Sequence, residues 1–234
     1  MIRRMNRIVL AAFVLLAAVP AQAAERRYTV TGFDRVQIDG PYVVTMNVGR
    51  SPSAVATGSP AALDRVSIAV EGRTLRVRPN LSAWGAPPKA GEGGVRIAIT
   101  GPELGAATVN GSATLTIDRI KAMRFDLGLS GSGQVAIGQA DVDRLNLQLL
   151  GAGGLKLAGK AKQLRATVTG QGSLDAGGLI ADDAEIAADT SGTIALGARR
   201  SAKVAAGGAG DVTISGTPAC TVTGSGAGRV SCGK

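Results

Sequence analysis

Aliphatic residues alternate with polar ones along most of the chain, and in its second half this alternation is organised into repeats. Leu115 and Ile117 alternate with threonine, and Phe125, Leu127 and Leu129 follow in a second alternating segment. A period of two places the aliphatic side chains on one face of a β-strand and the polar side chains on the other. Each repeat is therefore predicted to contain two short strands, and each strand is predicted to bury its aliphatic face.

Glycine-rich tripeptides separate these repeats. The third residues of successive tripeptides are 20, 20, 19, 20, 18 and 18 residues apart. The tripeptides are Gly111-Ser112-Ala113, Gly131-Ser132-Gly133, Gly151-Ala152-Gly153, Gly170-Gln171-Gly172, Thr190-Ser191-Gly192, Gly208-Ala209-Gly210 and Gly226-Ala227-Gly228. A regular period of this length is typical of a solenoid, in which each repeat buries its apolar face only by stacking on its neighbours. Glycine suits the sharp turns and the close approach of successive coils.

In the first part of the chain apolar and polar residues also alternate as in β-strands, although less regularly. We expect one all-β solenoid domain over residues 24–234, with an irregular part at 28–108 and regular coils of about 18–20 residues at 109–232. A hairpin is predicted from the alternating strands at 66–70 and 75–78. Residues 80–94, rich in glycine and proline, are predicted to form a long loop.

Residues 1–23 have the pattern of a secretory signal peptide. Three arginines precede an apolar run from Ile8 to Val19, and Ala21-Gln22-Ala23 forms a small-residue cleavage site. The apolar run is too short for a membrane span, so no transmembrane anchor is expected after cleavage. The pattern predicts export to the periplasm or the cell surface.

Charge and composition narrow the chemistry. Removal of the predicted signal peptide takes 3 of the 26 basic residues and leaves 23 against 17 acidic ones, a net charge of about +6. The basic residues are scattered and aromatic residues are few, which argues against a nucleic-acid partner. With no histidine, no metal site is predicted. The segment from Gly154 to Ala161 approaches a phosphate-binding loop but lacks the final Ser or Thr, so no cofactor is expected.

The two cysteines, Cys220 and Cys232, lie in the last repeat. Alternation with Val222 and Val230 places both at inward positions. Export to an oxidising compartment favours a disulfide between them, which would hold the last coil together. The alternative is a pair of buried thiols that act as small hydrophobic residues.

Three segments resemble a known family in order and spacing. They are Tyr28-Thr-Val-Thr-Gly-Phe33-Asp-Arg-Val36-Gln-Ile-Asp-Gly40, Val95-Arg-Ile-Ala-Ile-Thr-Gly-Pro102-Glu-Leu104 and Val109-Asn-Gly-Ser112-Ala-Thr-Leu-Thr-Ile117. With these segments the chain resembles the putative auto-transporter adhesin, head GIN domain family. The resemblance implies a right-handed, single-stranded β-helix-like solenoid in a bacterial cell-envelope protein. It brings no catalytic residues.

An enzyme and a binding module are both compatible with a β-solenoid. Polysaccharide-processing chemistry needs paired carboxylates, for which the candidates are Asp141 with Asp143 and Asp182 with Asp183. On a strand, Asp182 and Asp183 would point in opposite directions. Both pairs fall where the repeat turns, which favours solvated turn residues over a catalytic pair.

A non-catalytic binding or adhesion module is therefore the preferred function, and a purely structural envelope protein is a further alternative. The expected partner is an envelope protein, a glycan or a second copy of the chain. Trp84 is the candidate contact residue, because a tryptophan in a loop can stack on a sugar or dock a protein. Outward polar residues also suit binding, although solvent exposure explains each one singly. They are Thr114, Thr116, Arg124, Gln134, Asn146, Gln148, Lys156, Arg165, Thr167 and Thr169.

Overall fold

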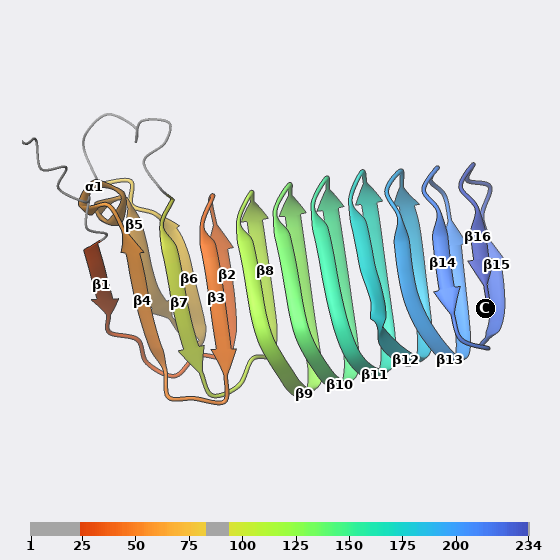
Figure 1. Cartoon of the computed structure of the whole chain (residues 1–234), viewed down its shortest axis with the longest axis horizontal. Coiled ribbons are helices and arrows are strands. Elements are labelled where there is room, and N and C mark those ends of the chain that lie inside the picture. The colour runs from red at the N-terminus through yellow and green to blue at the C-terminus, as the bar shows by residue number, and fades with distance from the viewer. Residues whose placement is uncertain (1–23, 83–93, 234) are drawn as a thin grey trace, which may run out of the picture.

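Five long strands form the centre of the structure, and each follows a coil around a common axis (Figure 1). The computed structural model describes residues 24–82 and 94–233. The strands are β9 (Thr114–Gly131), β10 (Gln134–Gly151), β11 (Gly154–Gly170), β12 (Ser173–Thr190) and β13 (Ile194–Ala206). Each pairs in parallel with the next. The predicted solenoid is confirmed, with about six turns.

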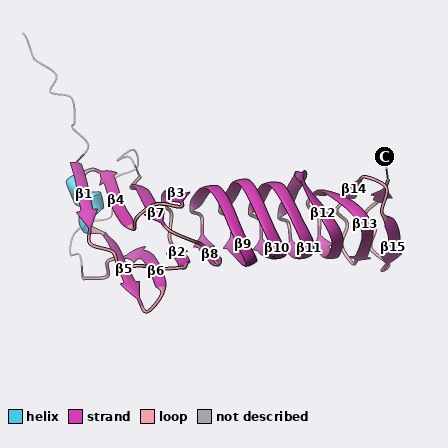
Figure 2. Ribbon diagram, turned by 90° about the horizontal axis from the view of Figure 1, so that it is seen from below, coloured by secondary structure: helices cyan, strands magenta, loops and turns pink. Residues whose placement is uncertain are grey.

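The coils enclose the core between two walls. Residues 114–117 of β9 and their counterparts in later coils form the first wall, called wall A, and residues 124–130 and their counterparts form wall B. Residues 118–123 turn the corner between the walls, and Figure 2 shows the long strands bending continuously there. The apolar side chains of both walls point inward, so the predicted alternation defines the core.

The corner differs from the prediction of two separate strands joined by polar or small residues. Ile120, Val142 and Leu179 lie at the corners of β9, β10 and β12 and are buried. Parallel pairing continues through the corner of the first coils, so one bent strand takes the place of two. Because the bend changes which side chains point inward, Ile117 and Ile120 are both buried although they are three residues apart.

Differences in coil length are absorbed at this same corner. Between β10 and β11 the register shifts between Ile137 and Ala140, and between β11 and β12 it shifts between Lys156 and Ala158. Two further shifts between β12 and β13 fall within residues 176–183. The coils of 18, 19 and 20 residues therefore keep both walls in register.

The irregular first part of the chain extends the same two walls. On wall A, β3 and β7 continue in parallel from β9, and β4 and β1 follow in antiparallel pairing. On wall B, β8, β2 and β6 continue in parallel, and β5 forms the predicted hairpin with β6. The bounds are β1 Ala24–Tyr28, β2 Arg35–Asp39, β3 Val43–Val48, β4 Ser53–Gly58, α1 Pro60–Asp64, β5 Val66–Glu71, β6 Thr74–Pro79, β7 Arg96–Gly101 and β8 Ala106–Gly111.

Glycine is required where the tripeptides close each coil. Gly151 has a φ of +112°, and a Cβ atom there would lie 2.6 Å from the carbonyl oxygen of Gly131 in the coil below. Both the backbone angle and the stacking distance therefore exclude a side chain. Thr190 occupies the equivalent position in a later coil, where its buried hydroxyl donates to the Gly172 carbonyl at 2.8 Å and accepts from the Gly192 amide at 2.9 Å.

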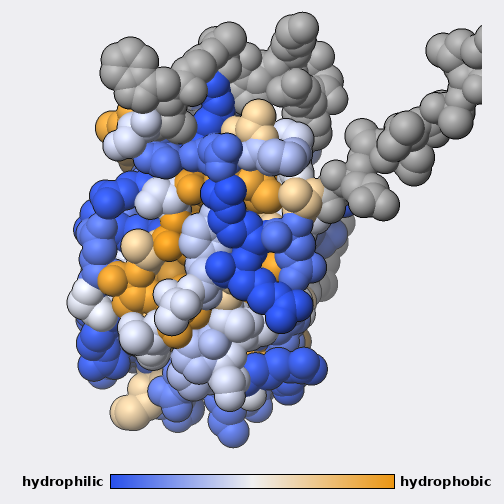
Figure 3. Space-filling model, turned by 90° about the vertical axis from the view of Figure 1, so that its left-hand side faces the viewer, coloured by the Kyte–Doolittle hydropathy of each residue, from blue (hydrophilic) through white to orange (hydrophobic). Residues whose placement is uncertain are grey.

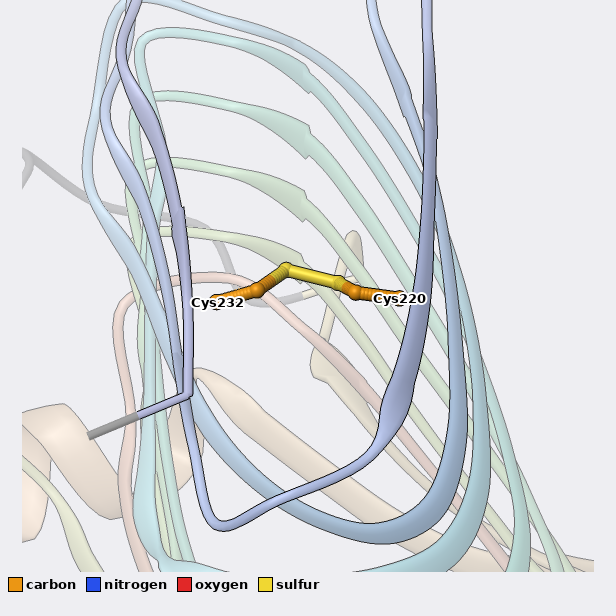
Figure 4. The surroundings of a disulfide bond; sticks show 2 residues. All are labelled: Cys220 and Cys232. Atoms are coloured by element: carbon orange, nitrogen blue, oxygen red, sulfur yellow. A yellow bond between two sulfur atoms is a disulfide. The ribbon is translucent and has the colours of Figure 1, made fainter.

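The last strands are short: β14 (Val212–Ser215) and β15 (Ala219–Thr223) form a coil on β13, and β16 (Val230–Cys232) stacks on β14 as the beginning of a further coil. A disulfide joins Cys220 on β15 to Cys232 on β16, with the Cα atoms 6.5 Å apart (Figure 4). Cys220 aligns with buried Ala202, as an inward residue should. It is nevertheless exposed, because among the described residues no further coil covers it. The predicted disulfide and the predicted inward position are thus both present, but the inward position of Cys220 does not bury it.

Replacement of Gly151 by alanine is expected to lower the free energy of unfolding by at least about 2 kcal/mol, from backbone strain and the clash with the coil below. Urea unfolding followed by far-UV circular dichroism measures this effect. Gly49→Ala is the control, because Gly49 also has a positive φ, +92°, but no atom lies within 4 Å of its added Cβ. Equal losses in the two variants would show that stacking makes no contribution.

Replacement of both cysteines by serine is expected to loosen the last coil while the central coils keep their stability. The bridge closes a short loop, with a sequence separation of 12, and a loop of about this size contributes about 3 kcal/mol. Hydrogen exchange should become faster at the amides of β15 and β16 and stay unchanged in β9 to β11. Unchanged protection of β15 and β16 would contradict this role.

Candidate functional site

The acidic pairs at the corner each face basic side chains of the following coil. Asp141 Oδ2 lies 3.4 Å from Lys160 Nζ, and Asp143 Oδ1 lies 2.8 Å from Lys162 Nζ. The hydrogen bond with Asp143 raises the pKa of Lys162. The Asp141 and Asp143 carboxylates are therefore held in ion pairs between coils, and exposed Glu103 lines the same surface hollow as both of them.

The second acidic pair repeats this arrangement in a later coil. Asp182 pairs with Arg199 at 4.0 Å, and Asp183 pairs with Arg200. The hydroxyl of Ser201 also donates to Asp183 at 2.8 Å, and this bond and the charge of Arg200 lower the pKa of Asp183.

Asp182 and Asp183 both point outward, contrary to the prediction for a strand, because the chain bends at the corner. A general acid needs a raised pKa, and that of Asp183 is shifted the other way.

Wall B carries a ladder of polar side chains on its outer face. Asp126, Asn146, Arg165, Glu185 and Lys203 occupy the same register position in five successive coils. The Asn146 side-chain amide donates to Asp126 at 2.7 Å, and Arg165 Nη2 donates to Glu185 at 2.6 Å. These contacts hold long side chains in fixed positions along the wall.

Two adjoining hollows lie along this ladder, and together we call them the wall B groove. The first has a volume of about 530 Å³ and the second about 510 Å³, and both are lined by Asn146 and Arg165. The other polar residues that line them are Thr108, Arg124, Asp126, Arg144, Gln148, Gln163, Thr167, Asp183, Glu185, Ser201 and Lys203. The groove is therefore long and shallow, and most of the residues that line it are polar.

Two cations of the groove are not neutralised by neighbours. Within residues 24–82 and 94–233, neither Arg144 nor Lys203 takes part in an ion pair or a side-chain hydrogen bond. Both line the first hollow, whose other charged side chains, Arg165, Asp183 and Glu185, are engaged with one another or with Arg200. Arg144 and Lys203 are thus the charged groups that remain available to an anionic ligand.

The polar residues predicted from the sequence divide between the two walls. The groove brings together Arg124, Asn146, Gln148, Arg165 and Thr167. On wall A, Thr114, Thr116, Gln134 and Lys156 face outward among small residues, and Lys156 pairs with Asp175 at 3.7 Å. Thr169 lies on wall B beyond the residues that line the groove.

Among the groove residues that sequence reasoning missed are Arg144, Gln163 and Lys203. Each directly precedes an inward aliphatic residue of wall B, so the alternation already marks all three as outward. Their positions beside one another become visible only when the coils are stacked. Trp84, the predicted contact, lies outside the described residues, so its role stays a prediction.

Among residues 24–82 and 94–233, no cluster of His, Cys, Asp or Glu residues is capable of holding a metal ion. Helix α1 has five residues, and no helix among residues 24–82 and 94–233 is long and apolar enough to cross a membrane.

Solved structures share this fold over nearly the whole chain. A putative adhesin from Bacteroides fragilis has a TM-score of 0.81 at 24% identity, covering 90% of this chain and 97% of that chain. A putative adhesin from Parabacteroides merdae has a TM-score of 0.69 at 18% identity, with coverage of 92% and 98%. A putative lipid binding protein from Parabacteroides distasonis has a TM-score of 0.68 at 19% identity, with coverage of 92% and 98%. At these identities the similarity shows the fold alone.

Sequence comparison assigns the family. No curated protein matches the chain. A family model described as "Putative auto-transporter adhesin, head GIN domain" matches residues 32–218, well over half of the sequence. That segment contains most of the N-terminal walls, the regular coils and the wall B groove. The chain therefore belongs to the putative auto-transporter adhesin, head GIN domain family.

Proposed function

We propose that this protein is an exported cell-envelope module that binds an acidic envelope polysaccharide along the wall B groove without cleaving it. The observation that carries the proposal is the presence of Arg144 and Lys203, both without ion-pair partners among the described residues, in one polar hollow. Guanidinium and ammonium groups donate charge-assisted hydrogen bonds to carboxylate and phosphate oxygens, which are stronger than neutral ones. Amides and hydroxyls between them suit the hydroxyl groups of a sugar chain.

The shape of the groove supports a polymer as the ligand. It runs across several coils, from Thr108 to Lys203, and it is open along its length. A small molecule is normally enclosed in a deeper and more apolar pocket. An extended chain instead makes many weak contacts along such a surface, and the fixed side chains of the ladder reduce the entropy lost on binding.

Export is supported by separate observations. Residues 1–23 have the sequence of a signal peptide, and the structure contains a disulfide, which persists in oxidising compartments. The family description, an adhesin, also fits a protein that acts at the cell envelope. The absence of catalysis is supported by the corner carboxylates, because ion pairs occupy all four of them.

The double variant Arg144→Ala/Lys203→Ala is expected to bind alginate, a polyuronate, at least about tenfold more weakly, since each lost charged hydrogen bond is worth about 1.5–3 kcal/mol. Affinity electrophoresis with alginate, and with dextran as the neutral polymer, measures this loss. Arg96→Ala/Lys156→Ala is the matched control, because it removes one Arg and one Lys from wall A.

An equal loss in the wall A control would show that net charge, and not the groove, determines binding. Release of reducing ends from alginate that disappears in Asp141→Asn/Asp143→Asn would instead establish the enzyme. Neither binding nor cleavage of acidic envelope polymers would favour the purely structural role.

The sequence predicts that Trp84 lies in a loop and contacts the ligand, so Trp84→Ala is expected to weaken the same binding by about tenfold without lowering the melting temperature, because a stacked aromatic ring contributes contact area to a sugar. Affinity electrophoresis and thermal unfolding provide the two measurements. A lower melting temperature with unchanged affinity would assign Trp84 to packing.

A further inference from the structure

The two ends of the solenoid are finished differently. At the N-terminal end, α1 packs against β1, β4 and β5, and its residues Ala62 and Leu63 are buried. Arg26 of β1 donates to the Leu63 carbonyl at 3.0 Å and pairs with Asp64 at 2.6 Å. Figure 3 looks onto this end and shows polar residues crossing it between smaller hydrophobic areas. Helix and charges together protect this end of the core.

The C-terminal end has no such cover among the described residues. All five residues of β15 are exposed, although Cys220 and Val222 align with the buried residues Ala202 and Val204 of the coil before. Val222 is 49% exposed. The strand β16, with Val230 and Cys232 at its inward positions, is also only half-buried. Inward-facing residues of a stacked coil are thus presented to solvent.

The two terminal strands, β15 and β16, also have a free hydrogen-bonding edge. In the described residues β15 pairs only with β13, and β16 pairs only with β14. Natural proteins protect edge strands with charged side chains, proline or a covering element, since a bare edge is a template for another strand. Neither β15 nor β16 contains a charged residue or proline, whereas the outer strand β1 at the other end contains Glu25, Arg26 and Arg27.

We propose that these two strands form a docking surface for a second copy of the chain, joined tail to tail about a two-fold axis. In the pairing, β15 meets β15 of the second copy and β16 meets β16, both antiparallel. Centred on Thr221, the register places Cys220 opposite Val222 and threonine opposite threonine. Centred on Ser231, it places Val230 opposite Cys232. The inward apolar residues of the two copies then meet each other, and on the outer face Thr221 meets its own copy and Ala219 meets Thr223.

The disulfide makes the two registers compatible with one axis. Cys220 and Cys232 face each other across the coil, so they lie at the same height along the strands (Figure 4). The chain runs in opposite directions on the two walls (Figure 1). Thr221, one residue after Cys220, and Ser231, one residue before Cys232, are therefore displaced in the same direction and lie at the same height. A single two-fold axis can pass through both.

The sequence favours a second copy over a head-to-tail chain. The C-terminal strands carry no charges, so their self-pairing opposes no like charges. The other end carries α1 and the ion pair of Arg26 with Asp64, which obstruct stacking of a further coil. An isologous interface closes at two copies and leaves no edge for growth.

Sedimentation velocity of residues 24–234 over a wide concentration series tests this interface. We expect a monomer–dimer equilibrium, with a dissociation constant raised at least about tenfold by Thr221→Lys, because two lysines would face each other on the axis. Thr116→Lys is the control, since Thr116 faces outward on wall A of a fully stacked coil. The melting temperature of each variant checks that it folds.

Hydrogen exchange adds a measurement that does not depend on mass. In the wild type, the amides of β15 and β16 should become more protected as concentration rises, while those of β10 stay unchanged. A protein that remains monomeric at every concentration would overturn the proposal. So would a dimer that Thr221→Lys leaves intact, or a series of larger species that grows with concentration.

Discussion

Parallel stacking of successive coils, each hydrogen-bonded to the next, is the constraint on which the rest of the structure depends. Adjacent strands lie about 4.8 Å apart, so every position in one coil lies directly above its counterpart. Inward positions must then repeat as apolar columns, as in Leu115, Val135 and Leu155. The same spacing leaves no room for Cβ atoms at Gly131 and Gly151, so the glycine tripeptides and the aliphatic alternation have one physical cause.

Stacking also determines how charges can be arranged on the surface. Like charges at equivalent positions of adjacent coils would repel, whereas opposite charges attract across the short spacing. The corner obeys this rule, since the acidic pair of one coil is followed by Lys160 and Lys162 and the acidic pair of another by Arg199 and Arg200. The acidic pairs at the corner resemble a catalytic pair in the sequence, but ion pairs between adjacent coils explain why they are there. Arg144 and Lys203 in the wall B groove are exceptions, because no opposite charge pairs with them among the described residues. Their free charge favours a binding role for the groove.

The sequence predicts features that recur in every coil and misses those that depend on neighbours. Alternation predicted the walls because an inward column must repeat, and the alternating strands at 66–70 and 75–78 predicted the β5–β6 hairpin. Ile120 escaped the pattern because the corner changes the inward direction within a few residues. Arg144 and Lys203 lie three coil interfaces apart, and only the stacking of the coils brings them into one hollow. The alternation within a single repeat therefore could not predict that they lie together. The exposure of Cys220 likewise depends on whether another coil covers its own, and alternation does not contain that information.

The register shifts at the corner have a consequence for how such a chain can change over time. A residue gained or lost there alters one coil, while the walls above and below keep their pairing. We therefore expect the corner to accept insertions that leave the pairing of the two walls, and hence most of the core, unchanged. New peptide loops could be displayed there at intervals of one strand spacing, which would give this scaffold a regularly spaced row of variable attachment points.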